Sequence, residues 1–120
     1  MGGASGGGWV SSGLLAQNIA NLAKKYPLGP DGKFGKPGKA TAQVIESRNP
    51  LATAKEFYEQ LSLGRESITS LTSGSGESAS MGNRQFVVFR PSSKSGGPAI
   101  SIRSKGSPDV DYKIHFLPEK

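Results

Sequence analysis

The chain has no cysteine and only one histidine, His115, among its 120 residues. Without cysteine there is no disulfide bond, no thiolate zinc site and no cysteine nucleophile. A single histidine also argues against a histidine-rich metal centre, so we expect no metal and no other cofactor. Histidine is the side chain best suited to proton transfer near neutral pH, which makes His115 a candidate catalytic residue.

Acidic residues and long apolar runs are also scarce. Lys and Arg number 15 against nine Asp and Glu, for a net charge of +6, and the pI is about 9.8. No apolar run approaches the length of a transmembrane helix, and the opening MGGASGGGWVSSG does not resemble a signal peptide. We therefore expect a flexible Gly-rich linker over residues 1–12, then a single domain over 13–120 with no membrane segment. The positive charge suits a polyanionic partner such as nucleic acid.

The basic residues concentrate in two separated segments. Residues 21–39 carry five lysines against Asp31, and residues 81–120 carry seven cations against three acids. Folding could bring these segments together into one basic surface that contacts backbone phosphates. A solvated loop with no partner is the alternative for the first segment. The candidate RNA-binding residues are Lys24, Lys25, Lys33, Lys36, Lys39 and Arg84.

Two stretches have the pattern of amphipathic helices. SSGLLAQNIANLAKKY places apolar residues at helical spacing and predicts a helix over 13–25. RNPLATAKEFYEQLSLG predicts a second one, because Asn49 can cap it, Pro50 suits its first position and Gly64 can end it. A short helical segment is also predicted over 40–48.

From residue 84 onward the pattern changes to alternation. RQFVVFR, AISIR and YKIHFL predict three strands of an antiparallel meander. The preceding stretch SLTSGSGESASMG is expected to be a polar loop. Helices followed by strands indicate the α+β class, with N-terminal helices packed on a small twisted antiparallel sheet.

Strand side chains alternate between two faces, which predicts one polar face for the sheet. If the apolar residues of YKIHFL face the helices, Lys113 and His115 lie on the open face. The same alternation puts Ser101 and Arg103 of AISIR beside them. The first strand is apolar on both faces, and one of its two orientations adds Arg90. The candidate catalytic residues are therefore His115, Lys113, Arg90, Arg103 and Ser101.

This residue set suits the cleavage of RNA without a metal. A base removes the proton of the 2′-hydroxyl, cations stabilise the charge on the phosphate, and an acid protonates the leaving 5′-oxygen. His115 would be the acid or base, with Ser101 orienting the phosphate and the three cations stabilising its charge. DNA lacks the 2′-hydroxyl, and its nucleases usually recruit a divalent ion through carboxylates or histidines. Asp31, Asp109 and Asp111 form no convincing group of that kind.

Other functions remain open at this point. A half-solvated antiparallel sheet in a basic protein has a basic outer face in any case. A non-catalytic nucleic-acid-binding module would use the same cations without needing His115. A metal-dependent DNase toxin is a third possibility.

The order of short patches resembles a known group of proteins. KYPLGPDGKFG, AKEFYEQL, GNRQFVVFRPSSKSGGPAISIRSKG and DYKIHF follow one another as in the nuclease domains of colicin D and related polymorphic toxins. These belong to the barnase–EndoU–colicin–RelE superfamily. The resemblance covers about residues 24–116. It implies N-terminal helices packed on a four-stranded antiparallel sheet, and a metal-independent ribonuclease that cuts tRNA.

In two segments the resemblance extends to individual residues. YKI at 112–114 is similar to the WKI of the closing strand in colicin-D-like domains, which implies a functional Lys113. KKYPLGPDGKFG stands in the place of a KHAGDFG-type segment, but it lacks the histidine of that segment. His115, on the sheet, would then take the role of that histidine.

The Gly-rich start before a compact basic domain resembles the C-terminal toxin portion of contact-dependent inhibition proteins. This implies the C-terminal part of a secreted or cell-surface effector that acts in the cytoplasm of a target bacterium. Such toxins are neutralised by a cognate immunity protein, which is typically acidic where it covers the active site.

Overall fold

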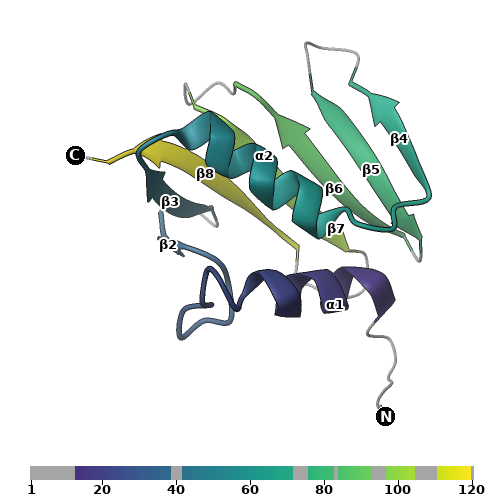
Figure 1. Ribbon diagram of the computed structural model, residues 1–120, viewed down its shortest axis with the longest axis horizontal. Coiled ribbons are helices and arrows are strands. Elements are labelled where there is room, and N and C mark those ends of the chain that lie inside the picture. Colours follow the sequence, from purple (N-terminus) through teal and green to yellow (C-terminus); the bar gives the residue numbers. More distant parts are fainter. Residues whose placement is uncertain are drawn as a thin grey trace.

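The fold is seen in a computed structural model, which describes residues 13–38, 42–71, 76–82, 84–92, 97–104 and 111–119. The expected linker over 1–12 and the candidate residue Lys39 lie outside the described residues. Figure 1 shows one twisted sheet with α2 lying across one of its faces and α1 along one end of its strands. No helix in the described part of the chain is long and apolar enough to span a membrane.

The sheet described here has seven strands, in the order β2-β3-β8-β7-β6-β5-β4. Neighbouring strands are antiparallel except β3 and β8, which run parallel. The chain is therefore an α+β protein with a mostly antiparallel sheet, as expected for the class. The strands are β2 (Lys36–Pro37), β3 (Gln43–Ser47), β4 (Ser67–Ser70), β5 (Glu77–Gly82), β6 (Gln85–Arg90), β7 (Ala99–Ser104) and β8 (Tyr112–Pro118).

Both long helices predicted from the sequence are present. The first, α1 (Gly13–Leu22), is shorter than predicted. The second, α2 (Pro50–Leu61), begins as its sequence indicates, because the Asn49 side chain accepts a hydrogen bond from the backbone N–H of Ala52 at 3.2 Å. Beyond the helix, Gly64 has a φ of +77°, a left-handed conformation that glycine adopts without strain.

Two local predictions are wrong. The segment 40–48 was expected to be helical, but Gln43–Ser47 forms β3, which pairs with β8 along its whole length. The stretch SLTSGSGESASMG was expected to be a loop, but it contributes to β4 and β5. The β3 strand takes its hydrogen bonds from β8, which is distant in the chain, and such pairing overrides weak local preferences. The β4 and β5 strands are largely polar, and they pair with each other and, through β5, with β6. The predicted three-strand meander is confirmed as β6, β7 and β8.

The core lies between α2 and the sheet, and Phe57 stands at its centre. Its ring meets those of Phe34 and Phe116 edge to face, with centroids 5.2 Å apart in each case. Tyr26 packs on the same ring at 4.7 Å. Phe34, Phe57 and Phe116 are fully buried. These contacts fasten the helix and the loop after α1 to the same side of the sheet.

Two buried polar contacts secure the helices and that loop. The Tyr112 hydroxyl accepts a hydrogen bond from the backbone N–H of Phe34 at 2.9 Å, and Tyr112 is buried, as its alternation predicted. The Asn18 amide donates to the carbonyl oxygens of Leu61 and Leu63 at 2.8 and 3.0 Å. Asn18 thereby satisfies carbonyl groups at the end of α2 that have no partner within the helix.

We predict that Tyr112→Phe lowers the free energy of unfolding by about 1–3 kcal/mol, because the buried N–H of Phe34 loses its acceptor. Urea unfolding followed by circular dichroism measures this. Tyr26→Phe is the matched control, because Tyr26 bonds to a half-exposed Glu56 that keeps Lys25 as a partner. An equal loss in both variants would contradict the role assigned to the Tyr112 hydroxyl.

Candidate active site

The sheet register brings the residues predicted for β7 and β8 onto one face. Ser101 lies opposite Lys113, and Ala99 lies opposite His115. Cross-strand partners of this kind share a face of the sheet. Ile114, which alternates with Lys113 and His115, is fully buried on the side of α2. The predicted open face of these two strands is therefore confirmed.

The register also resolves the orientation of β6. Val87 and Phe89 are buried on the helix side, so their neighbours point to the open face. Arg90 lies opposite Ala99, and Phe86 lies opposite Arg103. The five candidate catalytic residues therefore lie on one face of three adjacent strands: His115 and Lys113 on β8, Ser101 and Arg103 on β7, and Arg90 on β6.

The middle strand, β7, gives this face a floor of small side chains. Ala99 is 2% exposed and Ser101 is 5% exposed. Strands on either side of β7 are about 10 Å apart, so His115 and Arg90 face each other across Ala99. Between the longer side chains of β8 and β6, these two positions of β7 therefore present only small ones. A phosphate group above that floor can be reached from β8 and from β6.

His115 has the properties of a neutral base. Its side chain is half-buried, and its Nδ1 is buried without a hydrogen-bond partner among the described residues. Burial lowers the pKa of His115, and the nearby charge of Lys113 lowers it further. The imidazole is therefore uncharged at neutral pH and able to accept a proton. An unpaired buried polar atom is uncommon in folded proteins, and a catalytic role is one reason for it to persist.

The open face also carries carboxylates, which pair with two of its cations. Arg103 Nε lies 3.8 Å from Asp111 Oδ1, and Lys36 Nζ lies 3.4 Å from Glu46 Oε1. Both pairs are largely solvent-exposed, so each contributes little to stability. Within the described part of the chain, Lys113 and Arg90 form no ion pair.

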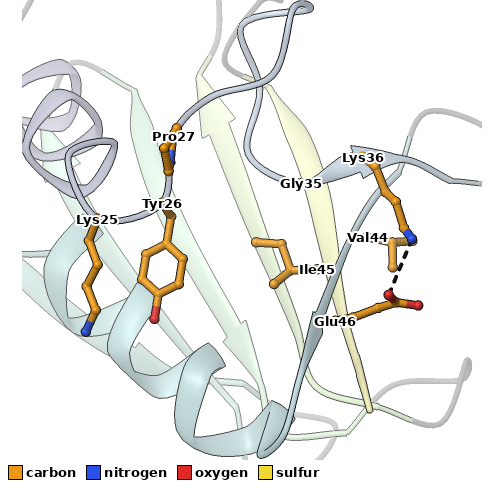
Figure 2. Close-up of a pocket in the computed structure, with 8 residues that line it drawn as sticks. All are labelled: Lys25, Tyr26, Pro27, Gly35, Lys36, Val44, Ile45 and Glu46. Carbon is orange, nitrogen blue, oxygen red and sulfur yellow. Dashed lines mark ion pairs between the residues drawn. The ribbon is translucent and has the colours of Figure 1, made fainter. Parts of the chain in front are cut away.

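Of the described lysines in the first basic segment, Lys36 joins the open face. It lies opposite Val44, which in turn lies opposite His115. Figure 2 shows Lys36, Val44 and Glu46 on one side of β3 and Ile45 on the other, toward Tyr26. These residues line a pocket of about 390 Å³ beside β3.

Other lysines of the first segment follow α1 and lie on the helix side. Lys25 Nζ pairs with Glu56 of α2 at 2.6 Å, and Figure 2 shows Lys25 and Lys36 well apart. Lys33 Nζ lies 5.4 Å from the centre of the buried Tyr112 ring. Lys24, next to Lys25, is exposed. Lys25 and Lys33 therefore do not form one surface with Lys36 and the open face.

A second hollow, of about 350 Å³, lies on the open face itself. Its lining includes Phe86, which is 39% exposed, together with Asp111 and Arg84. Sequence analysis missed Phe86, because QFVVFR is apolar on both faces and alternation alone does not orient it. Within the described residues, no group of three or more His, Asp or Glu side chains gathers as it would to hold a metal ion.

Comparisons with protein families, with curated proteins and with solved structures found no match to this chain.

We predict that Lys113→Gln raises the pKa of His115 only part of the way toward 6.5, because burial, the larger cause of the shift, remains. The chain has a single histidine, so an NMR titration of its imidazole resonances measures this directly. The matched control is Lys33→Gln, on the helix side, which should leave the titration unchanged. A wild-type pKa above 6.5 would contradict the inference of a neutral imidazole.

The same shift predicts a pH dependence of stability. The unfolded chain binds a proton at His115 more readily than the folded chain, because the folded pKa is the lower one. The contribution of His115 to the free energy of unfolding is therefore fully present above about pH 6.5 and is lost as the pH falls through the folded pKa. Unfolding of the wild type and of His115→Gln, compared from pH 7.5 to 5, measures this loss, which the variant should lack.

Proposed function

We propose that this protein is a metal-independent endoribonuclease that uses the open face of its sheet. One observation carries the proposal: a half-buried, neutral His115 lies on the same face as Lys113 and across the small Ala99 from Arg90. This arrangement brings a proton acceptor together with two cations that form no ion pair within the described residues, on the face that a phosphate would approach. General base catalysis and charge stabilisation are the two functions that RNA cleavage requires.

The reaction follows from the properties of these groups. The His115 imidazole takes the proton of the 2′-hydroxyl, and the 2′-oxygen forms a bond to the adjacent phosphorus. The bond from phosphorus to the 5′-oxygen breaks, and that oxygen takes a proton from the ammonium group of Lys113. The products are a 2′,3′-cyclic phosphate and a 5′-hydroxyl end. Arg90 and Arg103 stabilise the charge on the phosphate, and Ser101 orients it.

The proposal includes membership in the barnase–EndoU–colicin–RelE superfamily. In support of this, β5, β6, β7 and β8 form four consecutive antiparallel strands with the N-terminal helices on one side. In this assignment β2, β3 and β4 are additions at the two edges of that unit. The sequence patches with which the chain resembles colicin D provide the other support.

By the same resemblance we propose tRNA as the substrate and a toxin as the biological role. The domain would be the C-terminal part of a secreted or cell-surface effector that acts in the cytoplasm of a target bacterium. A cognate immunity protein with an acidic surface would neutralise it. The cations of the open face support such a partner, because oppositely charged surfaces associate rapidly and specifically.

A cleavage assay tests the enzyme directly. The domain is incubated with total RNA in EDTA, and new 3′ ends are mapped and tested for a cyclic phosphate. We predict that His115→Ala lowers the cleavage rate by about 10²–10⁴-fold while RNA binding persists, because general base catalysis contributes about that factor. Cuts in tRNA would support the proposed substrate.

Lys55→Gln is the control variant, because Lys55 is exposed on α2, on the helix side of the sheet, and a variant without its charge should cleave like the wild type. Unchanged cleavage by His115→Ala would remove His115 from the mechanism. RNA binding without any cleavage would favour a non-catalytic nucleic-acid-binding module. Cleavage of DNA that EDTA abolishes would instead identify a metal-dependent nuclease.

A further inference from the structure

The hollow of about 350 Å³ on the open face has an unusual lining. Phe86, one of the exposed large apolar residues, lies opposite Arg103, with Arg84 at the same end of β6. The hollow thus offers an aromatic ring with guanidinium groups close by. Its lining residues are Ser78, Arg84, Phe86, Val88, Arg103 and Asp111.

Arg84, which lines this hollow, has an unusual backbone conformation. Arg84 follows β5 in a tight turn and has a φ of +61°. Among the described residues it is the one non-glycine with a positive φ. This conformation is strained for a residue with a side chain, and glycine or asparagine usually occupies it in such turns. Strain of this kind often persists where a side chain has a function.

We propose that this hollow binds a nucleobase of the RNA substrate. The Phe86 ring provides a stacking surface, and Arg84 and Arg103 add planar cations that stack on bases or contact the flanking phosphates. A single-stranded base fits here better than a base pair, because unstacked bases are the ones that bind aromatic side chains. The inference rests on the proposed function for the identity of the ligand as RNA.

The hollow lies at the right distance from the candidate active site. Val88 lines it, and Ser101 and then Lys113 follow in the same cross-strand row. Phe86 on β6 is therefore two strands away from β8, which is about 10 Å across the sheet. Along the strand direction, Phe86 is two residues, or about 7 Å, from the cross-strand row that contains Lys113. A base stacked on Phe86 and a phosphate above Ser101 can belong to the same or to neighbouring nucleotides.

Asp111 is placed to discriminate among bases. Its Oδ1 lies 3.8 Å from Arg103 Nε, and its Oδ2 accepts a long bond from the backbone N–H of Ser104 at 3.4 Å. Both oxygens keep lone pairs for a further donor. Adenine, cytosine and guanine offer an amino group to a carboxylate. Uracil offers one N–H between two carbonyl oxygens, which a carboxylate repels, so we expect uracil to bind least well.

Titration with mononucleotides tests the subsite without requiring cleavage. The wild-type domain is titrated with AMP, CMP, GMP and UMP; the Phe86 ring protons report stacking by NMR, and the backbone amide resonances report the affinity of the wild type and of each variant. We expect upfield shifts from stacking and at least 10-fold weaker binding in Phe86→Ala, with Phe86→Tyr close to wild type. Ile68→Ala is the matched control, because Ile68 is 41% exposed on the opposite face of the sheet and should not affect binding.

Two further variants separate binding from folding. Arg84→Gly should raise the melting temperature by relieving the strained φ, yet weaken nucleotide binding several-fold. Asp111→Asn should reduce the difference in affinity between UMP and the other three nucleotides. Absence of Phe86 shifts with every nucleotide would overturn the subsite, and an unchanged ranking in Asp111→Asn would overturn the role of Asp111.

The outcomes also separate this inference from the proposed function. If the wild type cleaves RNA but Phe86→Ala binds nucleotides and cleaves as well as the wild type, the subsite is wrong and the enzyme assignment stands. If the nucleotides shift the Phe86 ring but no RNA is cleaved, the subsite stands and the enzyme assignment fails.

Discussion

The packing of Phe57 determines which face of the sheet becomes the open one. Its ring contacts Phe116 of β8 and Phe34 of the loop after α1, and all three are fully buried. Once α2 covers this side of the sheet, alternation along each strand assigns every other residue to the opposite side. Charged and polar side chains of the central strands therefore gather there, and a one-residue slip of β8 would put Lys113 and His115 in the core.

The character of the open face comes from the centre of the sheet. Ala99 and Ser101 on β7 have small side chains, and the longer side chains of β8 and β6 stand on either side of them. Burial lowers the pKa of His115 and so keeps its imidazole uncharged. Two of the cations on this face are paired with carboxylates, whereas Lys113 and Arg90 form no ion pair within the described residues. The face thus combines an imidazole that burial keeps neutral, positive charge and an aromatic hollow around Phe86, and the proposed function rests on this combination.

Local patterns predicted the helices and the meander well and the remaining strands poorly. Asn49 and Pro50 mark the start of α2 because capping is a local interaction. Local patterns did not predict β3, because this strand pairs in parallel with β8, which lies about 70 residues further along the chain. The polar strands β4 and β5 carry little apolar alternation; β4 pairs with β5, and β5 pairs with β6.

By itself, the sequence determined the α+β class, the second helix, and the alternation that puts His115, Lys113, Ser101 and Arg103 on one face, because these depend on residues close together in the chain. Only the tertiary structure decided the orientation of β6, which brings Arg90 and Phe86 to that face. It also separated Lys25 and Lys33 from Lys36, and it paired Arg103 with Asp111. These features depend on which strands lie side by side and on where the helices pack, and no local pattern encodes either.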